Sequence, residues 1–286
     1  MKTESERHDR VRHLLETLGA LPGLVVAFSG GADSAFLLAA AVRALGPDRV
    51  IAATAESDSL PRSEREPAAA FAAGLGVRHL SPSTHEIERD GYRANAGDRC
   101  YFCKAELMDV LGPIGAELGW PVATGTNADD ALAGFRPGIR AAAERGALAP
   151  LRDAGLTKQQ IRDTSHVWGL TTWDKPAAAC LSSRIAYGIE ISPALLARVE
   201  HAEAAVRDAA GALPLRDLRV RDLGHGRARL ELDQPTIDAL TDDAVTRDAL
   251  VAAVRAAGFG DVDVRAFRSG SMNDALRRHK TTTVDQ

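Results

Sequence analysis

The sequence predicts an α/β protein with a doubly wound parallel sheet, followed by a smaller C-terminal α+β domain. Short, continuously apolar runs alternate with helical patterns over roughly the first 180 residues, as in parallel sheets that are covered on both faces. The first of these runs leads directly into a Gly-Gly turn and a helical stretch. Beyond Tyr187 the pattern changes to helix, two alternating strands, helix and strand. These observations predict two domains, at residues 1–180 and 181–286.

The first predicted strand and the turn after it form the segment LVVAFSGGADS, residues 24–34. Residues 24–28 are predicted as a buried strand because they are continuously apolar. Gly30 and Gly31 permit a sharp turn and let an anion approach the backbone, and helix formers follow from Asp33. Amides at a helix N-terminus and the helix dipole favour the same bound anion. An ordinary strand-to-helix turn of small residues is the alternative.

The remaining elements are predicted from periodicity. The N-terminal helix precedes the first strand, because Val11, Leu14, Leu15 and Leu18 are spaced as on one helix face. In an open α/β sheet, ligands bind at the carboxyl ends of the strands, which brings Ala53 and Thr126 to the expected site. The first domain has further strands at 50–55, 77–80 and 122–126 and a helix at 63–74; the second has helices at 193–210 and 246–257 and strands at 217–222, 227–233 and 262–267.

Composition restricts the classes of function. The 286 residues are 45% hydrophobic and 26% charged, as in soluble globular proteins. No apolar run reaches about 18 residues, and the charged start MKTESERHDR lacks the apolar core of a signal peptide. We therefore expect a cytoplasmic protein with no membrane partner. The net charge of -4 argues against broad binding to nucleic acid, although a local basic patch remains compatible with it.

The three cysteines carry the second chemical signal. Cys100 and Cys103 lie three apart in DRCYFCK, and Cys180 lies in WDKPAAACLSSR, where an irregular loop is predicted. In a cytosolic chain, few cysteines indicate metal binding or catalysis rather than a disulfide framework. A zinc half-site, a redox pair and two buried thiols all fit the CxxC pair. Lys104 and Arg184 are near enough in sequence to stabilise a thiolate, and Lys104 is also placed to contact a phosphate.

The loop SGGADS resembles the SGGxDS loop of the PP-loop ATP pyrophosphatases, which split ATP into AMP and pyrophosphate. Neither the Walker pattern GxxxxGK[ST] nor the dinucleotide pattern GxGxxG occurs here. The resemblance implies that the loop binds pyrophosphate. The residues that it assigns to ATP and pyrophosphate are Ser29, Gly30, Gly31, Asp33 and Ser34, joined at the strand ends by Ala53, Thr126 and Asp130.

A longer series of motifs resembles the LarE family of ATP-dependent sulfur transferases, which make the nickel-pincer nucleotide cofactor of lactate racemase. In order, the motifs are SGGADS, TAESDSLPR, RCYFCK, GTNADD, GFRPG, APLRDAGLTKQQIR, WDKPAAACLSSR, YG, RVRDLGHGRARLEL and RSGSMND. The resemblance extends from about residue 20 to residue 275. It implies a small-molecule substrate, pyridinium-3,5-biscarboxylic acid mononucleotide. ATP with Mg²⁺ would adenylate a substrate carboxylate, and a thiolate would then attack the mixed anhydride.

The family also implies two ways of supplying sulfur. Members with a single active-site cysteine, here matched by Cys180, give up its sulfur and act once. This chain departs from them in having Cys100 and Cys103 as well, and so resembles members that hold a 4Fe-4S cluster by three cysteines. Three thiolates leave one iron open to carry an extra sulfide. Zinc bound by the same cysteines is the competing interpretation.

Other residues have alternative interpretations. Asp129 and Asp130 in GTNADD are placed to hold Mg²⁺ or ribose, or to stabilise a helix N-terminus. Arg136 is placed to contact a phosphate or to lie exposed. On the strand at 217–222, alternation places Arg219 and Arg221 on one face. The predicted catalytic residues are Asp33 and Cys180, with Glu203 as an aid to sulfur release. The predicted substrate-binding residues are Lys104, Arg184, Arg219 and Arg221. In the alternative interpretation, Arg219 and Arg221 are exposed edge charges.

Two other functions are compatible with the sequence. One is a tRNA-thiolating PP-loop enzyme, which the acidic balance and the lack of a recognisable RNA-binding module disfavour. The other is a nucleotide-binding module with a structural zinc site on the CxxC pair. The family resemblance further implies a homo-oligomer, either a dimer or a hexamer built as a trimer of dimers.

Overall fold

The computed structural model describes residues 2–132, 136–176 and 179–268, so the RSGSMND motif beyond Arg268 and part of GFRPG lie outside the described residues. The chain forms two compact units: Met1–Arg89 with Asp98–Ala178, and Asp90–Gly97 with Ala179–Gln286. Residues 90–97 belong to the second unit although the first surrounds them in sequence. Their Asn95 side chain donates to the carbonyls of Ala186 at 2.8 Å and Ile189 at 3.0 Å.

The first unit is built on a four-stranded parallel sheet in the order β3-β2-β1-β4. Strand β1 pairs with β2 on one side, where Ala27 lies opposite Ala53, and with β4 on the other, where Ala27 lies opposite Thr124. The predicted α/β class is thereby confirmed. The four strands are β1 (Leu24–Ala27), β2 (Val50–Ala53), β3 (Arg78–Leu80) and β4 (Val122–Thr124).

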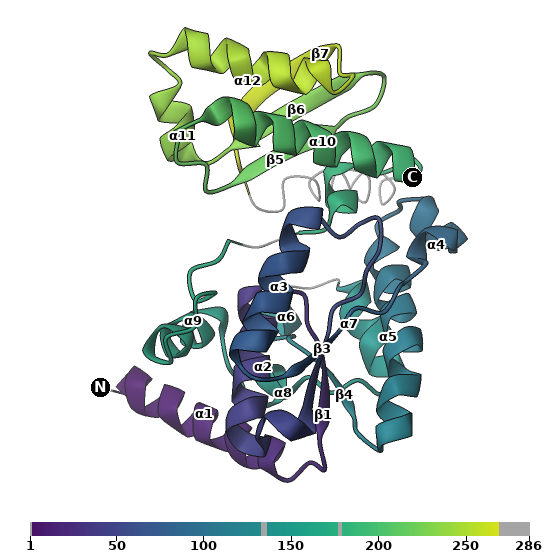
Figure 1. The fold of residues 1–286 in the computed structure, drawn as a ribbon, viewed down its shortest axis with the longest axis vertical. Coiled ribbons are helices and arrows are strands. Elements are labelled where there is room, and N and C mark those ends of the chain that lie inside the picture. The colour runs from purple at the N-terminus through teal and green to yellow at the C-terminus, as the bar shows by residue number, and fades with distance from the viewer. Residues whose placement is uncertain (1, 133–135, 177–178, 269–286) are drawn as a thin grey trace, which may run out of the picture. The chain divides into compact units, whose positions relative to one another are not determined.

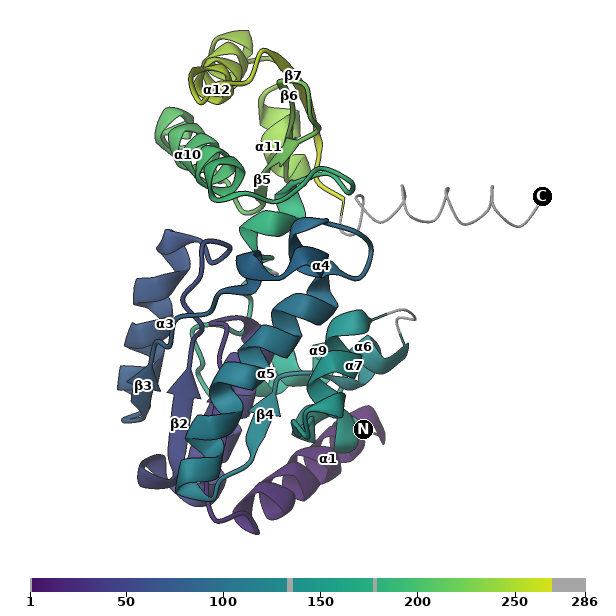
Figure 2. The ribbon, with the colours of Figure 1, turned by 90° about the vertical axis from the view of Figure 1, so that its right-hand side faces the viewer.

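Helices cover both faces of this sheet, as the continuous apolarity of the strands requires. Leu24 and Val26 of β1 face one layer, whereas Val25 and Ala27 face the other. Figure 1 shows α2 and α5 on opposite sides of the strands, and Figure 2 shows the sheet from the side that α5 covers. The first layer contains α1 (Lys2–Gly19), α2 (Ala32–Leu45), α3 (Arg62–Gly74), α8 (Pro150–Asp153) and α9 (Lys158–Val167), and the second contains α5 (Arg99–Leu118) and α7 (Pro137–Glu144).

The strand order creates a switch point at β1. The chain proceeds from β1 to β2 and β3 on one side, and β4 lies on the other side. The loops after β1 and β4 therefore diverge, and ligands of open α/β sheets bind where this happens. The short helix α6 (Ala128–Leu132) follows β4, and one-turn helices occur at Pro47–Arg49 and Glu86–Glu88.

The second unit contains a three-stranded sheet in the order β5-β6-β7. The strands β5 (Leu218–Asp222) and β6 (Arg227–Leu232) are antiparallel, and β7 (Asp261–Ala266) lies parallel to β6. The turn LGHG has left-handed backbone at Gly224, His225 and Gly226, with φ of 81°, 51° and 71°. The other elements are α4 (Asp90–Arg93), a one-turn helix η3 (Leu181–Arg184), α10 (Pro193–Ala210), α11 (Gln234–Ala239) and α12 (Ala244–Ala256).

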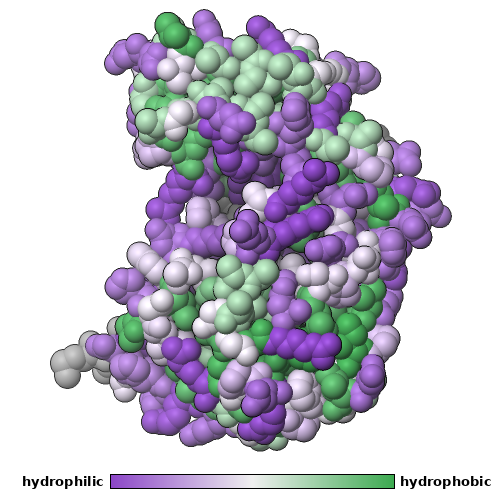
Figure 3. Space-filling model, in the orientation of Figure 1, coloured by the Kyte–Doolittle hydropathy of each residue, from purple (hydrophilic) through white to green (hydrophobic). Residues whose placement is uncertain are grey.

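The long helices of the second unit are predicted from the sequence, whereas the short helix α11 is not. The six-residue α11 was not predicted, because it is too short to show helical periodicity; its signals are the Asp233 cap and a proline in its first turn. The long helices α10 and α12 are rich in alanine, and Figure 3 shows weakly apolar surface over them. Among the described residues, no helix is both long and apolar enough to cross a membrane.

Candidate functional site

The loop between β1 and α2 has the geometry of an anion site. Gly30 has φ of 69°, a conformation that side chains disfavour. Gly31 is the N-cap residue of α2, and no side chain caps the helix. The first N–H groups of an uncapped helix have no intrahelical acceptor and lie at the positive end of the dipole. The Ser34 hydroxyl ties the loop together by donating to the Gly31 carbonyl at 3.1 Å and accepting from the Ser29 amide at 3.3 Å.

A pocket of about 400 Å³ opens beside this loop. Its walls come from the ends of β1, β2 and β4 and from α2, α5 and α9, all within the first unit. It brings together candidates that are far apart in sequence. Those lining it are Ser29, Gly31, Asp33, Ser34, Ala53, Lys104, Thr126 and Asp130; Gly30 lies in the same loop.

Four basic and two acidic side chains line the pocket. The basic residues are Lys104, Lys158, Arg162 and Lys175, and the acidic ones are Asp33 and Asp130. This excess of cations suits a polyphosphate, whose charge pairs well with lysine and arginine. Of these cations, only Lys104 is predicted as a site residue from the sequence.

Lys175, from the WDKP motif, was missed and contacts the loop directly. Its Nζ donates to the Gly30 carbonyl at 3.0 Å and pairs with Glu64 at 2.5 Å. Arg162 supports this segment by donating to the carbonyls of Lys175 at 2.8 Å and Trp173 at 3.3 Å. The signal in the sequence was a lysine before a proline, which by itself has no distinctive spacing.

Two further missed residues come from GTNADD. The buried Asn127 donates from Nδ2 to Asp33 Oδ2 at 3.2 Å, and it exchanges hydrogen bonds with Asp130 at 3.0 and 3.3 Å. A Cβ on Gly125 would lie 2.8 Å from the Ser34 amide nitrogen, so only glycine lets β4 approach the start of α2. The N-x-x-D spacing was the available signal for Asn127.

The surroundings of Asp33 disfavour the charged form of its carboxylate. Burial raises its pKa above the ordinary value, Lys158 opposes that increase, and the negative charge of Asp130 adds to it. Asp130 is itself paired with Arg136 at 3.6 Å and Lys158 at 3.8 Å. A divalent cation between the two carboxylates would relieve the repulsion, and carboxylate oxygens are the ligands that Mg²⁺ prefers. Asp129 instead accepts from the Lys158 amide, at the start of α9, at 2.7 Å.

The cysteines are divided between the units. Cys100 and Cys103 lie in the first turn of α5, where a spacing of three places them on one side of the helix. Cys180 precedes η3 in the second unit, and its carbonyl accepts from the Ser183 hydroxyl at 2.7 Å and from Arg184 at 3.0 Å. In the part of the chain that the structure describes, no three His, Cys, Asp or Glu side chains are grouped to hold a metal ion. By chemistry, three thiols suit iron–sulfur or zinc ligation.

Arg184 and Glu203 form a buried ion pair in the second unit. Two bonds join the side chains, at 2.9 and 3.2 Å, and both groups are nearly inaccessible. Glu203 also accepts from the Val220 amide at 3.0 Å. Arg184 therefore connects the Cys180 segment to α10 and, through Glu203, to β5.

Arg219 and Arg221 are both buried, contrary to the alternative that they are exposed edge charges. Arg221 binds Glu231 on the neighbouring strand at 2.9 Å and donates to the Ser183 carbonyl at 2.8 Å. Arg219 donates to the Leu218 carbonyl at 2.7 Å and lies over the Phe267 ring. Alternation along β5 places them away from Leu218 and Val220 as predicted, but residues of η3 also cover this side.

Three arginine side chains lie close enough to influence one another and form an arginine cluster (Arg184, Arg219 and Arg221). Burial and the neighbouring Arg184 charge lower the pKa of Arg219 to about 10, against the opposing effects of Glu203 and Asp217. Burial is the largest of these causes, because it disfavours the charged form of the guanidinium.

The chain is similar to known proteins over most of its length. Residues 4–96 match the NAD synthase family. The chain is 32% identical over 272 residues to pyridinium-3,5-bisthiocarboxylic acid mononucleotide synthase of Lactiplantibacillus plantarum, covering 94% of this chain and 96% of that protein. It is 39% identical to an uncharacterised Synechocystis protein, over 94% of this chain and 98% of that one. A third relative, from Methanocaldococcus jannaschii, is 30% identical over 46% of this chain and 52% of its own length.

Proposed function

Because the chain belongs to the LarE family of PP-loop ATP-dependent sulfur transferases, we propose that it inserts sulfur into pyridinium-3,5-biscarboxylic acid mononucleotide. The relative from Lactiplantibacillus plantarum is named for the bisthiocarboxylic acid product. The observation that carries the proposal is the uncapped start of α2 in a pocket lined by four cations and two carboxylates. A pocket of this kind fits the triphosphate of ATP.

The proposed reaction has two steps for each carboxylate. A substrate carboxylate oxygen attacks the α-phosphorus of ATP, the bond to the bridging oxygen breaks, and pyrophosphate leaves. The resulting acyl adenylate has AMP as a good leaving group. A sulfur nucleophile then attacks the acyl carbon and AMP departs, which leaves a thiocarboxylate once sulfur is released from its donor. Two rounds convert the dicarboxylate into the bisthiocarboxylate.

Residues of the first unit would stabilise the departing pyrophosphate. The N–H groups at the start of α2 are fixed in place by the Ser29, Gly31 and Ser34 contacts, so they need no reorganisation as charge develops. Lys158, Arg162 and Lys175 add positive charge. Asp33 and Asp130 would hold Mg²⁺, which offsets phosphate charge when bound.

For sulfur delivery, we propose that Cys100, Cys103 and Cys180 hold a 4Fe-4S cluster. The chain has three cysteines, so such a cluster would keep one position without a thiolate, and the open iron would carry a sulfide. The chemistry of the donor set supports this. Anaerobically reconstituted protein should bind about four irons per chain and, after reduction, show a cluster signal in electron paramagnetic resonance that is lost when Cys100 is changed to alanine. Zinc in place of iron in the metal analysis, or a chain lighter by the mass of H₂S at Cys180 in mass spectrometry, would contradict this proposal.

In the second unit we propose that Arg219 and Arg221 bind the substrate's phosphate and second carboxylate. The grouping of these two arginines with Arg184 in one buried cluster supports an anion site. Arg184 and Glu203 would hold this site and the Cys180 segment in place, in addition to the substrate-binding and sulfur-release roles expected from the sequence. Lys104 lines the ATP pocket and would contact a phosphate.

Pyrophosphate release is the direct test. Protein with Mg²⁺ and ATP should release pyrophosphate only when the pyridinium dicarboxylate is added, and mass spectrometry should detect product heavier by one oxygen-to-sulfur exchange per round. Release that depends on tRNA instead would assign the chain to the tRNA-thiolating enzymes. No release with either substrate would leave only nucleotide binding and overturn the proposal.

A further inference from the structure

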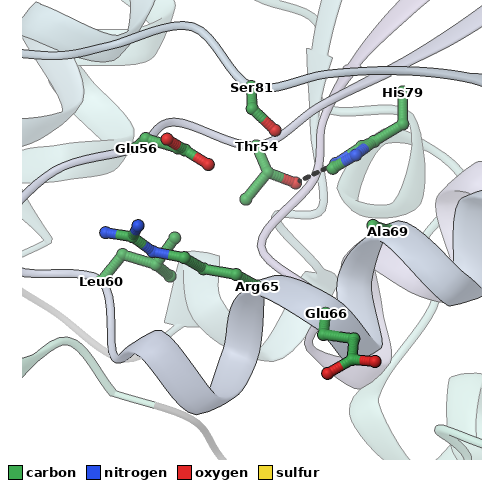
Figure 4. A pocket seen from close by; sticks show the side chains of 8 residues that line it. All are labelled: Thr54, Glu56, Leu60, Arg65, Glu66, Ala69, His79 and Ser81. Carbon is green, nitrogen blue, oxygen red and sulfur yellow. Dashed lines mark hydrogen bonds between the residues drawn. The ribbon is translucent and has the colours of Figure 1, made fainter.

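A chain of hydrogen bonds connects three neighbouring strands just below the pyrophosphate loop. Thr54 donates from Oγ1 to the Phe28 carbonyl at 2.8 Å, and the same oxygen lies 2.9 Å from His79 Nε2. Figure 4 shows the Thr54 and His79 side chains pointing toward one another. Phe28 directly follows β1, Thr54 follows β2, and His79 belongs to β3.

The direction of both bonds follows from the chemistry of the groups. A carbonyl oxygen accepts only, so the single Thr54 hydroxyl proton must point at Phe28. The Thr54 oxygen therefore accepts from His79, whose proton must be on Nε2. Burial lowers the pKa of His79, with Glu56 opposing the effect, so the ring is neutral at physiological pH and its Nδ1 is unprotonated.

The bonded carbonyl occupies a sensitive position. The β1–β2 register ends at Ala27 and Ala53, and the Phe28 amide is held by the Ala53 carbonyl at 2.8 Å. The Thr54 side chain thus fixes the next carbonyl, immediately before Ser29 begins the loop. His79 supports the same residue by a second contact, with its ring edge-on to the Phe28 ring at 6.4 Å and 84°.

His79 itself lies outside the pyrophosphate pocket. It lines a second cavity of about 240 Å³, between α3 and the ends of β2 and β3, whereas Thr54 lines both cavities. The charged groups around His79 in this cavity are Glu56, Arg65 and Glu66 (Figure 4). An effect of His79 on a ligand in the pyrophosphate pocket would therefore pass through Thr54.

We propose that His79 is a positioning residue for the pyrophosphate loop, acting through Thr54 on the Phe28 carbonyl. The proposal rests on the proposed function of the loop. Loss of the His79 N–H frees the Thr54 hydroxyl to rotate away from Phe28, and the loop amides lose part of their fixed direction. Preorganised donors are worth more than donors that must reorient on binding.

The test compares two probes by calorimetry on the full chain: magnesium pyrophosphate, which needs the loop, and AMP, which lacks the β- and γ-phosphates. His79→Leu removes the donor and should weaken pyrophosphate binding by about three- to tenfold, with AMP affinity changed less than about twofold. His79→Gln places an amide N–H at similar reach and should restore most of the affinity.

A double-mutant cycle establishes the route. Thr54→Val is nearly isosteric and removes the hydroxyl, so adding His79→Leu to it should weaken binding no further. Thr164→Val is the matched control, because the Thr164 hydroxyl is also buried and donates to a backbone carbonyl, that of Gln160, at 2.7 Å, within α9. It should leave both affinities unchanged.

The outcomes separate the two proposals. Wild-type protein that binds AMP but not pyrophosphate would overturn the assignment of the loop and this inference with it. Normal wild-type binding that is unaltered in His79→Leu would overturn only the positioning role. Additive losses in the double variant, or equal losses for pyrophosphate and AMP, would also exclude transmission through Thr54.

Discussion

The pyrophosphate loop and the arginine cluster are both suited to anions, but they are built differently. The loop offers backbone N–H groups, and its key side chains are small or lie at the pocket surface. The arginine cluster offers guanidinium groups that are buried and already engaged with Glu203, Glu231 and main-chain carbonyls. One site is shaped by the path of the backbone, and the other by charges held inside the protein.

This difference predicts where function and stability separate. Side chains around the loop can be changed with a loss of binding but little loss of folding, because the helix and sheet exist without them. In the arginine cluster, each ionic partner also compensates a buried charge, so its removal affects the fold.

A large loss of stability is expected for Glu203→Ala. It removes the carboxylate that Arg184 binds and the acceptor of the Val220 amide, and breaking a buried pair costs about 3–5 kcal/mol. Glu203→Gln should cost less, because its amide oxygen still accepts from both groups. Urea unfolding measures the free energy of unfolding. A loss below about 1 kcal/mol for the alanine variant would show that this ion pair stabilises the fold no more than an exposed pair does.

Asp33→Asn should produce the opposite pattern, a large loss of activity without a loss of stability. Burial and Asp130 raise the Asp33 pKa, so its charge destabilises the folded state and its neutralisation should leave the melting temperature unchanged or higher. Adenylation should fall by roughly 10²–10³-fold, as measured by pyrophosphate release. A folded variant with normal release would exclude Asp33 from the site.

Gly125→Ala tests whether backbone proximity shapes the loop. The new Cβ would lie 2.8 Å from the Ser34 nitrogen and 3.0 Å from its Cα, so α2 or β4 must move, at a cost of about 1–3 kcal/mol. Pyrophosphate affinity should fall as well, because the shifted amides form the anion site. The control is Gly74→Ala in α3, where a new Cβ meets open space, and it should be neutral or stabilising. Gly146 is unsuitable as a control because its φ of 72° disfavours any side chain.

The loop could be predicted because all its signals are local. Strand, glycine turn and helix start occur within eleven residues, and each has a characteristic composition. The residues that complete the pocket come from elsewhere: Asn127 is 94 positions from Asp33, and Lys175 is 145 from Gly30. Such pairings depend on the order of strands in the sheet, which periodicity does not specify.

The arginine cluster was predicted by position but not by environment. Alternation placed Arg219 and Arg221 together on one face, a pattern that also describes a strand with one exposed side. Their burial depends on η3 and on the cross-strand Glu231, and neither has a periodic signal. Residues 90–97 are a similar case, because their assignment to the second unit depends on hydrogen bonds from Asn95 to residues about 90 positions away.

Arg219 and Arg221 should respond differently to the same substitution. Arg221→Met removes the partner of Glu231 and should cost about 3–5 kcal/mol. Arg219→Met should cost less than about 1 kcal/mol or stabilise the fold, because a pKa lowered to about 10 means that its charge opposes folding at all lower pH values. Both variants should weaken binding of the pyridinium nucleotide. Chemical unfolding gives the comparison, and equal stability losses would contradict it.

The smallest predicted effect is the dependence of stability on the titration of His79. Its folded pKa lies below the ordinary value of 6.5, so the unfolded chain binds more protons in that range. The contribution of His79 to stability is therefore fully present above about pH 6.5 and decreases as the pH falls toward the folded pKa. In His79→Gln this contribution is absent, so the difference in urea midpoint between wild type and this variant should shrink from pH 7.5 to pH 5.5. The control is Thr164→Val, which leaves His79 in place and should keep a constant difference from wild type. A constant difference for His79→Gln as well would mean that the imidazole has the same proton affinity in both states, and that burial beside Thr54 does not hold the ring neutral.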